Sequence, residues 1–171
     1  MSTWEQLASL PLEIDRYDLE GRELAFSEEF VRYTTLITLR GGGEEGVGED
    51  VVYDGLDHAS FQAAGAVLPL AGSWTLGSFA ERLAELDTFP DPPVRGDVSR
   101  RYRNWAFESA ALDLALRQAG RSLQEHLGRD LRPLNYVVSM RLGMFGSDEP
   151  ETSEKMLRVL ERYPTTRLAW S

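Results

Sequence analysis

The chain has 171 residues, of which 42% are hydrophobic, enough to bury a core in one domain with a smaller appendage. A formal net charge of −10 would repel a phosphate backbone, so nucleic acid is not an expected partner. The absence of cysteine excludes disulfides, thiol nucleophiles and thiolate metal sites. The first residues show no signal peptide, and the longest apolar stretch, Ala63–Ala71, is too short for a bilayer. We therefore expect a cytoplasmic protein that does not enter a membrane.

Three strands are predicted in the first third of the chain. Leu12–Leu19 alternates apolar and charged residues, as a half-buried strand does, and Gly21 is expected to mark a turn after it. Val31–Leu39 is rich in β-branched and aromatic residues, which favour strands. The glycines at 41–43 then predict a reversal into a third strand over 46–53. Glycine-rich connections of this kind predict an antiparallel meander.

Helical periodicity follows in the middle of the chain. Thr75 is expected to cap a helix whose apolar face runs through residues 76–86. Three prolines predict a loop over 88–96. A second helix with small residues on its inner face is predicted over Phe107–Ala119.

The C-terminal segment predicts a strand over Leu134–Met140, a helix over Glu151–Arg162 and a second strand over Thr165–Trp170. This order is typical of a parallel sheet or barrel. The predicted fold class is α+β. A three-stranded antiparallel meander followed by packed helices occupies residues 1–132, and a β-α-β opening of a TIM-like barrel occupies 133–171. Two strands are a quarter of an eight-stranded barrel, so the barrel is incomplete in this chain.

Several segments share their order and spacing with a known family: Arg32–Leu39, Gly46–Glu49, Ser109–Leu116, Ala119–Arg121 and Leu127–Gly128. The pattern resembles the enolase superfamily, in particular its mandelate racemase and muconate lactonizing branch. The resemblance runs from Leu12 onward and implies an N-terminal capping domain of the enolase type, followed by the start of the barrel.

The resemblance implies abstraction of a proton next to a carboxylate by a Lys or His base, with Mg²⁺ stabilising the enediolate. Racemases, epimerases, cycloisomerases and dehydratases share this step. The chain departs from the family at Gln118, where an aspartate is usual, and at Arg167–Ala169, where a Lys-x-Lys pair often supplies the base. The family's acidic metal ligands lie on later barrel strands, which are absent here. We therefore assign no catalytic residue, and we expect this chain alone to bind no Mg²⁺ and to be inactive.

The resemblance also implies that two capping-domain loops close over the barrel mouth and select the substrate, a small carboxylate. They correspond to Gly21–Phe30 and Asp54–Phe61, and the end of the first barrel strand would add two further residues. The candidate specificity residues are Arg22, Phe26, Phe30, Asp54, His58, Phe61, Ser139 and Arg141. Arg22 is suited to hold a carboxylate by a two-pronged hydrogen bond, although an ordinary surface arginine is the alternative.

Other local signals have alternative readings. Asp54, Asp57 and His58 could hold a metal ion, but aspartate also favours polar turns and helix caps. The arginines at 95–103 alternate with aromatic residues, as in a nucleic-acid patch. In a chain with this negative charge, we expect them to pair with its own carboxylates. Lys155, the only lysine, is expected on a solvated helix face.

Three functions stay open. The chain is either the N-terminal portion of an enolase-superfamily enzyme, or a non-catalytic binding or assembly module built from the capping domain, or a piece that completes its barrel by pairing with another chain. The open edges of the two C-terminal strands favour the first and the third, because unpaired edges recruit further strands. We accordingly expect a homo-oligomer.

Overall fold

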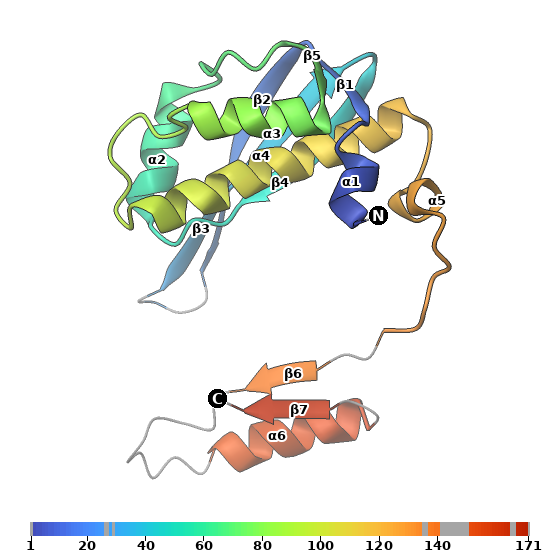
Figure 1. The fold of residues 1–171 in the computed structure, drawn as a ribbon. Helices are drawn as coiled ribbons and strands as arrows, with labels where there is room; N and C mark the ends of the chain where they lie inside the picture. Colours follow the sequence, from blue (N-terminus) through green and yellow to red (C-terminus); the bar gives the residue numbers. More distant parts are fainter. Residues whose placement is uncertain are drawn as a thin grey trace. The chain divides into compact units, whose positions relative to one another are not determined.

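The fold is that of a computed structural model, which describes residues 2–25, 28, 30–134, 137–140, 151–164 and 167–170. The chain divides into a larger unit, Met1–Arg129, and a smaller unit, Asp130–Ser171. In chain order (Figure 1) the elements are α1 (Thr3–Leu7), β1 (Pro11–Ile14), β2 (Arg16–Ala25), β3 (Val31–Gly41), β4 (Glu44–Asp50), α2 (Gly55–Ala64), β5 (Gly72–Thr75), α3 (Leu76–Glu85), α4 (Asp97–Gln118), α5 (Leu123–Leu127), β6 (Val137–Met140), α6 (Glu151–Arg162) and β7 (Arg167–Trp170).

A three-stranded antiparallel sheet with the order β2-β3-β4 underlies the larger unit. Tyr17 of β2 pairs with Leu39 of β3, and Leu39 pairs with Gly46 of β4. Gly42 and Gly43 both have positive φ, 58° and 82°, and form the two-residue turn that joins β3 to β4. The predicted meander is confirmed, and the sheet with its packed helices makes the fold class α+β.

The segment predicted as one strand over Leu12–Leu19 is in fact two strands. β1 pairs antiparallel with β5 in a separate two-stranded sheet, whereas β2 belongs to the three-stranded sheet. The buried side chains change phase at this break: Leu12 and Ile14 lie two residues apart, but the next buried residue, Tyr17, comes three residues later. Side chains alternate strictly within one strand, so a change of phase marks its end.

The turn predicted at Gly21 is wrong, because β2 continues through it to Ala25. Gly21 pairs with Thr35 inside the sheet. A side chain at this position would collide with the side chain of Gln62 in α2. The glycine therefore lies inside the strand beside the side chain of Gln62, and it does not reverse the chain.

The loop predicted over Asp54–Phe61 is also wrong, because this segment is the N-cap and the first turns of α2. The carboxylate of Asp54 accepts a hydrogen bond from the backbone N–H of Leu56 at 2.9 Å, which is how aspartate begins a helix. Asp57 and His58 then lie buried on the inner face. Their polarity suggested a loop, yet tertiary partners satisfy both side chains.

The two predicted central helices are present. Thr75 caps α3 through a reciprocal pair of hydrogen bonds with Ser78, as expected. Residues 88–96 contain no helix or strand, which confirms the predicted loop. α4 begins at Asp97, ten residues before the predicted start at Phe107, because the polar arginine-rich segment is helical as well. Among the described residues, no helix has the length and apolar character needed to cross a membrane.

The long helix α4 packs across β4 (Figure 1), and their backbones approach closely at two glycines. The inner face of β4 presents Gly46 and Gly48, and the facing side of α4 presents Ala106 and Ala110. A methyl group at Gly48 would overlap the backbone carbonyl of Ala106, and one at Gly46 would overlap the backbone of Ala110. The distance between helix and strand is therefore set by the missing side chains.

Gln118 ties the C-terminal end of α4 to two strands. Its amide oxygen accepts from the backbone N–H of Glu13 at 3.0 Å. Its amide nitrogen donates to the carbonyls of Glu13, at 2.8 Å, and Gly41, at 3.0 Å. A carboxylate here could accept the first bond but could not donate the other two, so the glutamine suits this junction of α4 with β1 and β3.

The core of the larger unit lies between the three-stranded sheet and the helices that cover it. Ile37 and Leu39 of β3 are fully buried there, as are Phe79 of α3 and Phe107 of α4. Phe107 and Tyr17 meet edge to face, with their ring centroids 5.6 Å apart.

In the smaller unit, β6 and β7 pair in parallel, in register from Val137 with Arg167 to Met140 with Trp170. α6 connects them in the chain and has the predicted bounds. The predicted β-α-β order is confirmed, because α6 lies between the two parallel strands in the chain. Parallel strands need such a crossover. The described residues show two strands and no closed barrel, so the barrel stays a prediction.

The packing of α4 on β4 predicts that Gly48→Ala lowers the free energy of unfolding by about 3 kcal/mol, because the methyl group forces helix and strand apart. Urea unfolding followed by circular dichroism measures this change. Glu49→Ala is the matched control, since its side chain is exposed on the opposite face, and it should cost less than about 0.5 kcal/mol. Equal losses in the two variants would contradict the close approach.

Candidate functional site

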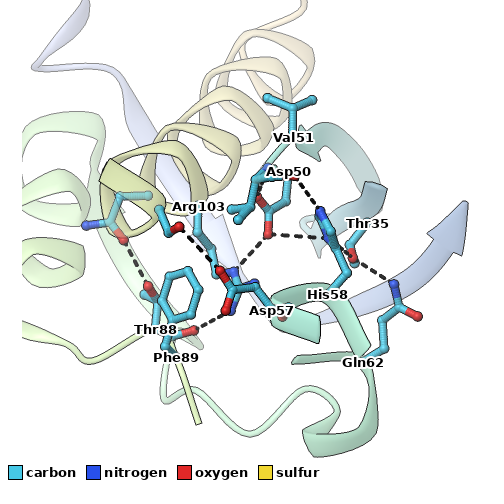
Figure 2. Close-up of polar contacts among 12 residues, drawn as sticks. Thr35, Asp50, Val51, Asp57, His58, Gln62, Thr88, Phe89 and Arg103 are labelled. Atoms are coloured by element: carbon cyan, nitrogen blue, oxygen red, sulfur yellow. Dashed lines mark hydrogen bonds and ion pairs between the residues drawn. The ribbon is translucent and has the colours of Figure 1, made fainter. Parts of the chain in front are cut away.

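Residues 51–54 join β4 to α2. A buried network of polar side chains lies beside this segment (Figure 2). Arg103 of α4 is the centre of the network and is fully buried. Its Nε donates to the Asp50 carboxylate at 2.8 Å. Its two terminal nitrogens donate to the backbone carbonyls of Thr88, at 3.1 Å, and Asp57, at 2.8 Å. One guanidinium thereby joins β4, α2 and the loop before α4.

Two aromatic rings complete the surroundings of Arg103. The guanidinium carbon lies 3.9 Å from the ring centroid of Phe61 and 3.6 Å from that of Phe89. Burial lowers the pKa of Arg103, while the charge of Asp50 and its hydrogen bond act in the opposite direction. An arginine titrates so far above neutrality that the group remains a cation, and the pair is a buried salt bridge.

Asp57 extends the network to the loop over residues 88–96. Its carboxylate accepts a hydrogen bond from the backbone N–H of Val94 at 3.2 Å and one from the Ser99 hydroxyl at 3.3 Å. Because Asp57 is engaged in this way and Asp54 caps α2, these carboxylates have structural partners. No group of three or more His, Asp and Glu side chains within the described part of the chain is placed to hold a metal ion.

The His58 side chain takes part in a chain of hydrogen bonds that runs from Gln62 through Thr35 to Val52. Its Nε2 lies 3.0 Å from the carbonyl of Val52, which can only accept, so Nε2 carries the proton. The Thr35 hydroxyl accepts from the amide of Gln62 at 2.8 Å and lies 2.9 Å from Nδ1 of His58. The same Nδ1 lies 3.9 Å from the carboxylate of Asp50. Both ring nitrogens are occupied, and the side chain is only 1% exposed.

Hydrogen bonds hold the backbone of residues 51 and 52, which lead into Tyr53. Asp50 accepts from the N–H of Val52 at 3.1 Å, and the guanidinium of Arg32 donates to the carbonyl of Val51 at 2.6 Å. With its neighbours held, Tyr53 faces solvent and is 61% exposed. The exposed tyrosine therefore stands on a rigid support, which lowers the entropic cost of ordering the site when a ligand binds.

The Tyr53 edge, as we define it, comprises Arg32, Tyr53, Arg95 and Tyr102. The guanidinium carbons of Arg32 and Arg95 lie 5.0 and 5.1 Å from the ring centroid of Tyr53, and the ring of Tyr102 meets it at 6.1 Å. Neither arginine forms an ion pair with a carboxylate among the described residues. Two unpaired guanidinium groups beside one aromatic ring can bind a carboxylate by charge-assisted hydrogen bonds.

Two of the predicted specificity residues lie on the exposed hairpin of β2 and β3. Arg22 pairs with Thr34 in the sheet, and its guanidinium forms a surface salt bridge with Glu20 at 2.9 Å. Phe30 precedes β3 and is 53% exposed. Phe26 lies outside the described residues. The role of these three in substrate selection stays a prediction.

The other five predicted residues are placed differently. His58 and Phe61 are buried in the interior, at 1% and 2% exposure, and Asp54 caps α2, so the structure gives all three a structural task. Ser139 lies in β6, but its side chain is outside the described part, as is Arg141 altogether. The predicted site therefore does not gather into one place within the described residues.

The arginines predicted to pair with the chain's own carboxylates do so in part. Arg103 pairs with Asp50, and Arg100 forms a surface salt bridge with Asp87 that lowers the pKa of this carboxyl. Arg95 instead stacks on Tyr53.

Asp50 and Arg103 were not among the predicted site residues, although sequence patterns could have indicated that they are buried. Asp50 continues the inner-face alternation that begins with Gly46 and Gly48, and Arg103 lies three residues before Ala106 on the same face of α4. Because both residues follow the buried positions of their elements, the sequence could have indicated a buried ion pair. Nothing in the sequence connects Arg32 with Arg95, because they meet only through the fold.

Comparison with known proteins yields one family and one fold. The family described as "Domain of unknown function (DUF8230) N-terminal domain" matches residues 5–126. No curated protein matches the chain. The structure is similar to that of an isomerase from Streptomyces coelicolor A3(2), with a TM-score of 0.58 and 19% sequence identity over 93% of this chain. The chain spans 44% of the length of that isomerase, and at this identity the likeness describes the fold alone.

The buried network predicts that Arg103→Leu lowers the free energy of unfolding by about 3–5 kcal/mol, because Asp50 is left as a buried charge without its partner. Arg117→Leu in the same helix is the matched control. It removes an exposed salt bridge with Asp113 and should cost less than about 1 kcal/mol. Chemical denaturation of both variants measures the difference. A near-native stability of Arg103→Leu would mean that the ion pair does not hold these elements together.

Proposed function

Since the chain belongs to the DUF8230 N-terminal domain family, we propose that it works as the N-terminal part of a larger catalyst. In this proposal the larger unit is the capping domain of an enolase-superfamily enzyme of the mandelate racemase and muconate lactonizing kind. The smaller unit is the first β-α-β of its barrel.

The observation that carries this proposal is the order of the architecture. An antiparallel meander packed against a long helix is followed by a parallel β-α-β unit. A capping domain with two of eight barrel strands would make up less than half of a complete enzyme. The chain spans 44% of the isomerase whose fold it resembles, and this agrees with such a division.

The proposed reaction is the abstraction of a proton next to a carboxylate, as in racemases, epimerases, cycloisomerases and dehydratases. In such enzymes Mg²⁺ stabilises the resulting enediolate. The described residues contain no group suited to hold this ion, so the role we propose for them involves no metal. Their task is to bind and orient the substrate and to exclude water from it.

The Tyr53 edge is the part of the capping domain that we propose for substrate binding. Arg32 and Arg95 supply positive charge that no carboxylate of the described chain neutralises, and Tyr53 supplies a flat apolar surface between them. A small carboxylate with an apolar body satisfies both features. The buried Arg103 network keeps this edge in place before the substrate arrives.

A non-catalytic binding or assembly module is the second candidate function. β6 and β7 form a sheet of only two strands within the described residues, and such a pair is marginal without further strands. Those strands come either from a longer chain or from another copy, which would make the protein a homo-oligomer. The size of the protein in solution and its intact mass distinguish these cases.

The first test is the intact mass of the protein purified from its own cells, combined with an exchange assay in D₂O. We expect a mass well above 19.2 kDa and Mg²⁺-dependent exchange of the α-proton of carboxylate substrates, followed by proton NMR. A mass of 19.2 kDa without exchange would overturn the enzyme proposal and support the module.

In the exchange-active protein, Arg95→Ala should raise KM for the carboxylate by about tenfold with little change in kcat, because it removes one charged hydrogen bond to the substrate. Arg101→Ala is the matched control, an exposed arginine of α4 outside the Tyr53 edge, and should leave KM unchanged. Arg22→Ala in the same assay tests the earlier candidate: an unchanged kcat/KM removes Arg22 from the site. Equal KM values for wild type and Arg95→Ala would remove the Tyr53 edge.

A further inference from the structure

A groove of about 210 Å³ lies where α1, α3 and α4 meet, and it serves no purpose in the function proposed above. Leu76 and Phe79 of α3 line its apolar floor. Trp4 of α1 and Trp105 of α4 also line it, and they are 54% and 59% exposed. Two large indole rings at the surface of one groove are unusual for a part of the protein that contacts only water.

The α4 side of the groove follows one stripe of the helix. Trp105, Glu108 and Leu112 lie three and four residues apart, so their side chains project in the same direction. From Trp105 to Leu112 the stripe is about 10 Å long at 1.5 Å per residue. The groove therefore has the length of a short extended molecule.

Among the described residues that line the groove, Glu108 is the one with a charge. Within the described chain it has no hydrogen bond and no ion pair. Although it remains open to solvent, partial burial raises the pKa of its carboxyl. A carboxylate beside two indole rings and an apolar floor is suited to pair with a ligand of opposite charge.

We propose that this groove binds a small organic ammonium ion with an apolar body of about six carbons. The ammonium group pairs with Glu108 and contacts the faces of Trp105 and Trp4, because indole is the best aromatic partner for a cation. The carbon chain covers Leu76 and Phe79 on the floor. The proposal does not depend on the enzymatic function, since none of these residues belongs to the Tyr53 edge.

The chemistry of the groove disfavours other occupants. An anion would be repelled by Glu108, and a neutral alkane would leave that carboxylate without a partner and partly desolvated. A volume of about 210 Å³ is also smaller than the roughly 300–1,000 Å³ of pockets for drug-sized ligands. A short amine satisfies the size, the charge and the aromatic walls together.

Three probes with the same carbon chain test the charge requirement: hexylammonium, hexanol and hexanoate. Hexylammonium should bind about tenfold more tightly than hexanol, and hexanoate should bind most weakly. In ¹⁵N-labelled protein the indole N–H signals of Trp4 and Trp105 should shift during the titration. Trp74 is the internal control, because its N–H donates to the carbonyl of Leu70 at 3.0 Å. Equal affinities for hexylammonium and hexanol would overturn the proposal, and so would shifts at Trp74 alone.

Substitution of Glu108 distinguishes a site that recognises a cation from a surface that binds apolar molecules without regard to charge. Glu108→Gln should reduce the preference for hexylammonium over hexanol from about tenfold to less than about twofold, while hexanol binds as before. Glu81→Gln, on an exposed position of α3 outside the groove, should keep the full preference. Neither change removes a hydrogen bond seen in the described chain, so both variants should fold. A full preference in Glu108→Gln would overturn the proposal.

The raised pKa of Glu108 adds a test by pH. The folded state holds the proton more tightly than the unfolded state, so the charged carboxylate costs stability above the folded-state pKa, and this cost disappears below the unfolded-state pKa. Glu108→Gln should therefore raise the melting temperature at pH 7 but not at pH 3.5. Hexylammonium should likewise lose its advantage over hexanol as the pH falls through the folded pKa. An advantage that persists at pH 3.5 would contradict the role of Glu108.

Discussion

The buried guanidinium of Arg103 is the interaction on which the larger unit depends. It donates to Asp50 at the end of β4, to the carbonyl of Asp57 in α2 and to the carbonyl of Thr88 before α4. A desolvated cation costs several kcal/mol unless its partners are all in place. If any one of these three segments moved away, Arg103 would lose a hydrogen-bond partner while its guanidinium stayed buried. Their arrangement is therefore far more restricted than apolar packing alone would make it.

The ion pair in turn requires the short distance between α4 and β4. Gly46 and Gly48 allow the helix backbone to approach the strand, and Asp50 follows them on the same face. This combination of close packing and buried charge supports the residues that come next in the chain. Tyr53 is exposed between two arginines, and the backbone of the two residues before it is held by hydrogen bonds. The buried Arg103–Asp50 pair and the exposed Tyr53 edge are therefore connected through residues 51 and 52.

Two surface features of opposite sign stand out against this interior. Among the residues that the structure describes, the guanidinium groups of the Tyr53 edge have no carboxylate partner, and the carboxylate of Glu108 in the groove beside Trp105 has no cationic partner. Most other charged groups with a described partner form ordinary salt bridges at the surface. A charged group beside an aromatic ring offers a ligand both a charge partner and a flat apolar surface. The proposed anionic substrate and the proposed ammonium ligand follow from these two places.

The sequence by itself determined the antiparallel meander, the helix capped by Thr75 and the β-α-β order at the C-terminal end, because side-chain periodicity and capping are local properties. The roles of the candidate specificity residues in substrate selection stay predictions. Only the tertiary structure decided that residues 54–61 form a helix and that His58 is an interior residue. It also brought Arg103 to Asp50, 53 positions away, and Arg95 to Arg32. Such meetings depend on which faces pack together, and the partners of a polar side chain are not encoded by its neighbours in the chain.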